Sequence, residues 1–263
     1  MTIKLVVCDM DGTLIGKDEV IESFIPRMIH ELNARDIRFI IATGRTPELS
    51  NSIISRLEIE DPCVLTNGAV IVQQSNVIVK HSFRVWPLQS LIENAVSYDM
   101  SVIFAGDKHD TVLQKTPWIV KQNQLFGRYL QEYMPMINEW ELLKLSKITI
   151  WDKTHQIERI TDSLFQRFSR KYAITKYDSS CVEIAPVGIN KGTGIRQIAE
   201  LLQIELSEIM AIGDHYNDLE MITSAGIGVA IGTAPDEVKQ AANYVTEKPL
   251  AYGVLEAVNL YCQ

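Results

Sequence analysis

The sequence has no long apolar run and no surplus of positive charge, and each absence excludes a class of function. No apolar stretch approaches the roughly 18 residues that a membrane-spanning helix needs, so we expect no membrane partner. The formal net charge of −8 argues against broad binding to nucleic acid or to an anionic membrane surface. An anionic substrate would therefore need a local positive charge or a metal ion.

Cysteine is also scarce, and its spacing excludes the common cysteine-based sites. The four cysteines are far apart, with no Cys-x-x-Cys pair and no cysteine–histidine spacing of a zinc site. Because the N-terminus carries no secretory signal pattern, we expect reduced, buried thiols and a cytoplasmic location. Cys8 stands beside an acidic pair, but its place in an apolar strand favours a core role over that of a nucleophile.

What is present is the composition of a globular protein with a sizeable core. Hydrophobic residues make up 46% of the 263 residues and charged residues 22%, which argues against large-scale disorder. A chain of this length exceeds what one core usually serves. We therefore expect either one large domain or two smaller ones.

The chain is organised around an acidic turn near its beginning. An apolar run over 5–8 is typical of a buried parallel strand, and Asp9 and Asp11 follow at its carboxyl end, where open α/β sheets bind ligands. Gly12 allows a sharp turn that brings backbone N–H groups close to a ligand, and the small Thr13 keeps the site open. The turn suits a divalent cation and an oxyanion. Taken alone, it fits a solvated acidic turn equally well.

A second strand, predicted over 37–42, ends in a hydroxyl group and a glycine. We expect a helix over 20–34 before it and another over 48–57 after it, so that the first two strands form a βαβ unit. Thr43 then lies at the same sheet edge as the acidic turn. Its hydroxyl and the Gly44 N–H, at a helix N-terminus, can hold a phosphate oxygen. A plain helix cap is the alternative role for Thr43.

A third strand of the same sheet is predicted over 63–65. Asn67-Gly68 follows it, and the alternation over 70–72 and 77–79 predicts a hairpin.

The composition changes from residue 84 to residue 186. All four tryptophans fall in this stretch, and its predicted helices and strands lack the regular βαβ order. We interpret 84–186 as an α+β domain inserted into an α/β core that consists of 1–83 and 187–263.

After the insert, the α/β pattern resumes and adds further polar strand ends. Asn190 is a candidate N-cap for a helix over 191–202 that opens with Lys191. A buried strand over 209–212 leads into Asp214 and Asp218. Acidic residues on two strand ends, with a hydroxyl and an ammonium group between them, form a site for Mg²⁺ and phosphate.

These polar stretches resemble, in the same order, the four motifs of the haloacid dehalogenase-like (HAD) phosphohydrolases. The Asn-Gly turn, the place of the insert and the strand that leads into Lys191 are similar to the Cof-type (IIB) branch. The resemblance implies an α/β fold: a doubly wound, parallel-sheet, Rossmann-like HAD core with an inserted α+β cap domain. The stretches are Asp9-Met10-Asp11-Gly12-Thr13-Leu14, Ala42-Thr43-Gly44-Arg45, Lys191, Gly213-Asp214-His215-Tyr216-Asn217-Asp218, and, for the branch, Asn67-Gly68-Ala69, Glu183-Ile184-Ala185-Pro186 and Asn190-Lys191-Gly192.

The resemblance implies catalytic roles for three residues. Asp9 would be the nucleophile that attacks phosphorus to form an aspartyl-phosphate, which water then hydrolyses. Asp11 would be the general acid for the leaving oxygen and then the base for water. Lys191 would neutralise charge on the phosphoryl group and hold Asp9 in place.

The resemblance further implies Mg²⁺ as the cofactor. The ligands would be the Asp9 carboxylate, the Asp11 backbone carbonyl and the Asp214 carboxylate. Asp218 would assist from behind these ligands or through water.

The phosphoryl group would be bound at the same edge. Thr43, Lys191 and the N–H groups near Met10 and Gly44 would meet its negative charge. Asn217 would reach the phosphate or the rest of the substrate.

The inserted domain would act as a cap that excludes water and selects the leaving group. Its polar candidates for contact with a substrate are Lys108, His109, Lys147 and Asp178, and each also fits an ordinary surface residue.

Together, these features predict a Mg²⁺-dependent phosphatase that hydrolyses small phosphomonoesters, with sugar phosphates as the favoured substrates. A phosphomutase of the same fold and a non-catalytic phospho-ligand-binding module are the alternatives. We expect a small phosphorylated metabolite as the partner, neither nucleic acid nor membrane, and a monomer or homodimer.

Overall fold

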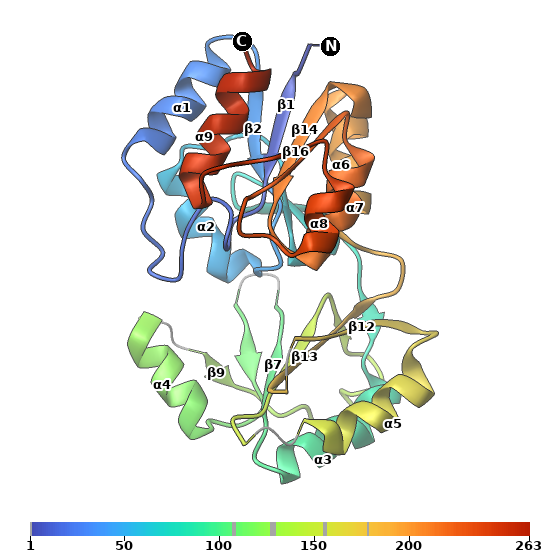
Figure 1. Cartoon of the computed structure of the whole chain (residues 1–263). Coiled ribbons are helices and arrows are strands. Elements are labelled where there is room, and N and C mark those ends of the chain that lie inside the picture. Colours follow the sequence, from blue (N-terminus) through green and yellow to red (C-terminus); the bar gives the residue numbers. More distant parts are fainter. Residues whose placement is uncertain (1, 107–108, 127–129, 155–156, 178) are drawn as a thin grey trace. The chain divides into compact units, whose positions relative to one another are not determined.

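The computed structural model describes residues 2–106, 109–126, 130–154, 157–177 and 179–263, and it divides into two compact units (Figure 1). Unit 1 comprises Met1–Arg45, Leu49–Val79 and Ile189–Gln263; unit 2 comprises Thr46–Glu48 and Lys80–Gly188. The sequence predicts a catalytic core that ends at residue 83 and resumes at 187. That unit 1 is this core and unit 2 its cap stays a prediction.

The main sheet of unit 1 has five parallel strands in the order β16-β15-β14-β1-β2. All four residues of β1 are buried, as expected of a parallel strand covered on both faces. This sheet is the doubly wound α/β fold that the sequence predicts. The strands are β1 (Leu5–Cys8), β2 (Arg38–Ile41), β14 (Ile209–Gly213), β15 (Ile227–Ala230) and β16 (Tyr244–Val245).

Helices flank this sheet in two groups: α1 packs against α9, and α7 packs against α6 and α8 (Figure 1). α1 buries Ile25, Met28, Ile29 and Leu32, whose spacing of three and four residues places them on one helix face. Pro26 falls in the first turn, where a missing N–H breaks no helical hydrogen bond. The helices are α1 (Phe24–Asn33), α2 (Pro47–Arg56), α6 (Lys191–Leu202), α7 (Leu219–Ser224), α8 (Asp236–Ala241) and α9 (Leu250–Tyr261), with 3₁₀ turns η1 (Thr66–Gly68), η3 (Leu206–Glu208) and η4 (Tyr216–Asp218).

The third strand differs from the prediction. β3 (Cys63–Leu65) forms a separate three-stranded sheet with β4 (Val70–Gln73) and β5 (Asn76–Lys80), in the order β3-β4-β5. A parallel bridge between Ala42 and Val64 joins it to the main sheet. The predicted hairpin is confirmed, and its turn residues Gln74 and Ser75 are left-handed, as in a type I′ turn.

Unit 2 is an α+β unit built on a six-stranded sheet in the order β12-β13-β11-β7-β8-β9, with a two-stranded ladder of β10 and β6. Ile148, Ile150, Val182 and Ile184 point from one face of the sheet into a core of its own. The elements are β6 (Phe83–Arg84), η2 (Trp86–Leu88), α3 (Gln89–Ser97), β7 (Ser101–Phe104), β8 (Thr111–Val112), α4 (Pro117–Phe126), β9 (Gln131–Glu132), β10 (Lys144–Leu145), β11 (Ile148–Trp151), α5 (Glu158–Phe168), β12 (Tyr172–Lys176) and β13 (Cys181–Pro186).

The structure gives the burial of the cysteines and the length and polarity of the helices. All four cysteines are buried, as expected, and burial raises the pKa of the Cys63 thiol to about 12. Within the described ranges, no helix combines the length and the apolar character that crossing a bilayer demands.

Candidate active site

The register of the main sheet brings three predicted site segments to one edge. Cys8 at the end of β1 is level with Ile41 of β2 and with Ile212 of β14. The residues that follow these strand ends therefore emerge side by side. The Asp9 N–H continues the ladder by donating to the Ile212 carbonyl oxygen at 2.9 Å, which fixes the backbone that carries the Asp9 carboxylate.

The centre of the site is a buried lysine between two carboxylates. Lys191 Nζ lies 2.5 Å from Asp9 Oδ1 and 2.6 Å from Asp218 Oδ1, and all three side chains are almost completely buried. Burial alone would lower the pKa of Lys191, but the carboxylates of Asp218 and Asp9 outweigh it and raise that pKa above its usual value. The lysine therefore supplies a buried positive charge beside Asp9.

Burial has the opposite consequence for the carboxylate that Lys191 contacts. It raises the pKa of Asp9 well above the usual value, and Lys191 opposes this shift while Asp218 adds to it. A further cation beside Asp9 would favour its ionised form.

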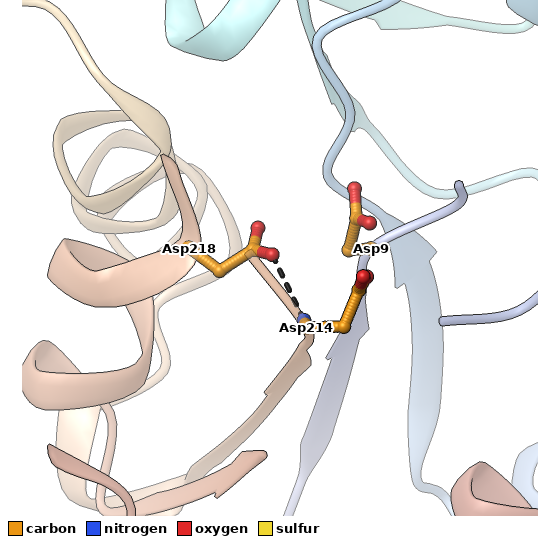
Figure 2. A group of neighbouring side chains, drawn as sticks. All are labelled: Asp9, Asp214 and Asp218. Carbon is orange, nitrogen blue, oxygen red and sulfur yellow. Dashed lines mark hydrogen bonds between the residues drawn. The ribbon is translucent and has the colours of Figure 1, made fainter. Parts of the chain in front are cut away.

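Three carboxylates lie close enough to share a cation. One oxygen each of Asp9, Asp214 and Asp218 lie within 4.8 Å of one another (Figure 2). These hard oxygen donors, partly or fully buried, fit a small divalent ion such as Mg²⁺. Burial raises the pKa of Asp214, and a hydrogen bond of 2.6 Å from Thr13 Oγ1 to Asp214 Oδ1 opposes that shift.

Asp218 differs from the other two because both of its oxygens already bind protein groups. Oδ2 accepts from the backbone N–H of Asp214 at 3.0 Å (Figure 2). It also accepts from the His215 N–H at 2.9 Å, and Oδ1 accepts from Lys191. Asp218 therefore fixes the backbone after β14 and the Lys191 side chain, while its assisting role toward a metal ion stays a prediction.

Asp11 is held apart from the carboxylate cluster. Its side chain is 50% exposed and forms a forked pair with Arg45, at 2.8 Å to Nε and 2.5 Å to Nη2. Arg45 Nη1 also lies 2.7 Å from Glu19 Oε1. The sequence pattern contains Arg45 but gives no role to it or to Glu19, because their pairing depends on chain folding between distant segments.

Three of the residues predicted to bind phosphate, Thr43, Gly44 and Asn217, lie in the segments that follow β2 and β14. Thr43 is buried and its Oγ1 accepts from the Arg45 N–H at 3.1 Å, while Asn217 Nδ2 donates to Asn67 Oδ1 at 3.0 Å. The Met10 side chain belongs to the core, so only its backbone can serve a ligand. Sequence reasoning missed the side chain of Asn67, although its Asn-Gly turn was noted.

The unit 2 residues predicted to contact a substrate differ in exposure. Lys108 and Asp178 lie outside the described residues. The side chain of His109 is 80% exposed, whereas Lys147 is nearly buried and lies 2.7 Å from Glu183.

A family model shows to which protein family the chain belongs. The model of the haloacid dehalogenase-like hydrolases (Hydrolase_3) matches residues 6–258, almost the whole chain. The chain belongs to the HAD-like hydrolases.

Similar proteins agree with this membership. The chain is 27% identical to a 5-amino-6-(5-phospho-D-ribitylamino)uracil phosphatase of Bacillus subtilis, over 97% of this chain and 94% of that protein. It is 26% identical to a phosphoglycolate phosphatase of Methanosarcina acetivorans, over 98% and 96%. These HAD matches identify the protein as a HAD-type phosphatase, an enzyme that hydrolyses phosphoric monoesters.

Solved structures share the fold over the full length. A haloacid dehalogenase-like hydrolase from Bacteroides thetaiotaomicron has a TM-score of 0.85 at 24% identity, covering 98% of this chain and 99% of its own. A HAD subclass IIB sugar phosphatase has a TM-score of 0.78 at 23% identity, with coverage of 98% and 99%. The Cof-type resemblance is thus confirmed for the fold.

Proposed function

We propose that the protein is a Mg²⁺-dependent phosphatase that hydrolyses small phosphomonoesters through an aspartyl-phosphate on Asp9. The observation that carries this proposal is the position of Asp9, buried at the carboxyl edge of the parallel sheet and paired with Lys191 at 2.5 Å. An isolated structural ion pair would not require two further carboxylates within reach of the same point.

In the first step, an Asp9 carboxylate oxygen attacks phosphorus and the bond from phosphorus to the leaving oxygen breaks. Asp11 gives its proton to that oxygen, so the leaving group departs as an alcohol. In the second step, water attacks the same phosphorus, Asp11 takes the proton, and the Asp9 carboxylate is released with inorganic phosphate. Lys191 keeps the Asp9 carboxylate oriented and balances its charge throughout.

Mg²⁺ would be held by the carboxylates of Asp9 and Asp214 and by the backbone carbonyl of Asp11. When bound, it supplies positive charge to the phosphoryl oxygens, which otherwise repel the carboxylate nucleophile. Asp218 keeps the Asp214 backbone in place by accepting a hydrogen bond from the Asp214 N–H.

The phosphoryl oxygens would be bound by groups of the chain itself. The hydroxyl of Thr43 and the backbone N–H groups of Met10 and Gly44 donate to them, and Lys191 adds its charge. Charge in the transition state spreads over these oxygens, so donors fixed in advance stabilise it more than they stabilise the free ester.

For the leaving group, we propose a small hydroxylated molecule such as a sugar. The similar proteins reported above include a sugar phosphatase, which supports this choice of leaving group.

The test of the reaction is the Mg²⁺-dependent release of phosphate from an aryl phosphate and a panel of sugar phosphates. We expect the wild type to turn over, chelation to stop it, and Asp9→Asn to be inactive although folded. Asp162→Asn changes an exposed aspartate in the same way and should remain fully active. Acid quenching during turnover should trap a phosphorylated peptide that contains Asp9.

Transfer of the phosphoryl group back to a sugar without free phosphate would point to a mutase. A wild type that is inert with every ester, with or without Mg²⁺, would contradict the proposed reaction.

A further inference from the structure

The turn Thr66–Gly68 has a backbone that the mechanism above leaves unexplained. Thr66, Asn67 and Gly68 all have positive φ, at 54°, 52° and 93°. A β-branched threonine is strained in this region, whereas glycine is not. The Thr66 hydroxyl is also buried, and within the described part of the chain it has no hydrogen-bond partner. Both features reduce stability, and such features persist where function requires them.

The turn is held between segments of unit 1 that carry predicted site residues. The Asn67 N–H donates to the Thr43 carbonyl oxygen at 3.0 Å. On the other side, a Cβ atom on Gly68 would lie 2.2 Å from the Asn190 carbonyl oxygen, so the turn packs directly on the N-cap of α6. The backbone therefore places the Asn67 side chain at a fixed point beside the phosphate-binding loops.

The carboxamide of Asn67 contacts two residues predicted to bind phosphate. Its Oδ1 accepts from Asn217 Nδ2 at 3.0 Å. It also lies flat against Gly44, where an added Cβ atom would be 3.0 Å from Oδ1 and 3.2 Å from Nδ2. One side chain thus fixes the Asn217 amide and occupies the space beside the Gly44 backbone.

We propose that Asn67 is a positioning residue for the phosphoryl group of the substrate. It orients the Asn217 carboxamide and supports the Gly44 loop so that both present N–H donors to the same phosphate oxygens. The left-handed turn is the means by which one amide reaches both. This inference rests on the proposed phosphatase function, since it concerns the same site.

The test variant is Asn67→Gly, which removes the carboxamide and relieves the left-handed backbone. If Asn67 serves only the fold, losing its hydrogen bond should lower Tm. If it positions phosphate binders, Tm should stay or rise while the KM of an aryl phosphate and the Ki of inorganic phosphate increase about tenfold. The value of kcat should change less than KM, because the contact acts on the bound phosphate.

Gln74→Gly is the matched control. Gln74 is also an amide residue with positive φ, at 47°, in the β4–β5 turn of the same unit. Glycine therefore relieves the same kind of backbone strain at both positions. For Gln74→Gly we expect no change in the Ki of inorganic phosphate. In the double variant Asn67→Gly with Asn217→Ala, the Ki should rise by less than the product of the two single effects, because part of the effect of Asn67 acts through Asn217.

Three results would each overturn the inference. The first is an unchanged Ki in Asn67→Gly, and the second is a fall in its Tm together with weaker phosphate binding. The third is a double variant in which the two single effects on the Ki multiply in full. A wild type that neither hydrolyses phosphomonoesters nor binds inorganic phosphate would instead overturn the proposed function. The two failures are therefore distinguishable.

Discussion

At the scale of single residues, Gly12 is a position where an added side chain would reach a predicted metal ligand. Its φ is +87°, and a Cβ atom there would lie 2.3 Å from Asp214 Oδ2. We predict that Gly12→Ala displaces the Asp214 carboxylate and weakens Mg²⁺ binding by about tenfold to a hundredfold. The measurement is the Mg²⁺ concentration that gives half-maximal phosphate release.

Gly188→Ala separates this clash from backbone strain. Gly188 has a similar φ of +75°, but nothing lies within 4 Å of an added Cβ atom. This variant should lose about 1 kcal/mol of stability and keep its Mg²⁺ dependence. Equal Mg²⁺ effects in both alanine variants would contradict the role given to Gly12.

Arg45 illustrates a residue whose importance depends on the leaving group. Its forked contact holds both oxygens of Asp11, and a lysine cannot reproduce that geometry. If Asp11 is the general acid, Arg45→Lys should lower kcat/KM about tenfold or more for a sugar phosphate, whose alkoxide leaves poorly. For p-nitrophenyl phosphate, which needs little proton transfer, the loss should be small.

The control for this prediction is Arg38→Lys. Arg38 is the exposed first residue of β2, at the strand end away from Thr43, and its Nη1 lies 2.5 Å from Asp61 Oδ1. Both substrates should be unaffected. A uniform loss for both substrates in Arg45→Lys would show that Arg45 acts on binding and not on proton transfer.

At the scale of elements, the stability of helix α6 depends on the cap at its N-terminus. Asn190 Oδ1 accepts from the Thr193 N–H at 2.9 Å, and Thr193 Oγ1 accepts from the Asn190 N–H at 3.0 Å, which completes a capping box. Asn190→Ala should lower the free energy of unfolding by about 1 kcal/mol, measured by urea denaturation. Asn190→Ser should keep most of this stability, because serine also caps; equal losses would argue against the cap.

The elements also show what the sequence can predict. β1 and β14 are continuous apolar runs, and such runs mark buried parallel strands wherever they occur. β3 is equally apolar, yet it pairs with β4 and not within the main sheet. The turn between β3 and β4 decides this pairing, and the apolar character of the strand does not. The two-residue strands β8 and β9 are too short to leave a periodic signal.

The same limit applies to the site. Carboxylates that follow parallel strands must share an edge, so Asp9 and Asp214 could be placed together from local patterns. The contacts of Asp11 with Arg45 and of Asn67 with Asn217 join loops 34 and 150 residues apart. No local pattern encodes those pairings, since they depend on how the loops cross at the sheet edge.

At the scale of the whole molecule, Mg²⁺ should act as a stabilising ligand. A protein of net charge −8 that gathers three carboxylates at one point gains stability when a cation binds the folded state. At a hundred times its Kd, Mg²⁺ should contribute about 2.7 kcal/mol. Thermal melting should show a higher Tm with Mg²⁺ than with EDTA.

Asp214→Asn should abolish this Mg²⁺ shift, whereas Asp162→Asn should keep it. A shift of equal size in both variants would mean that the ion binds elsewhere on the acidic surface.

The pairing of Lys191 with two carboxylates has a consequence for the order of addition. The carboxyl groups of Asp9, Asp214 and Asp218 can together carry three negative charges, and the one ammonium group of Lys191 leaves up to two of them uncompensated. A dianionic phosphate ester is repelled by such a cluster, and one divalent ion makes it neutral. Turnover should therefore follow an ordered sequence in which the cation enters first and the ester second, and the apparent KM of the ester should fall as free Mg²⁺ rises.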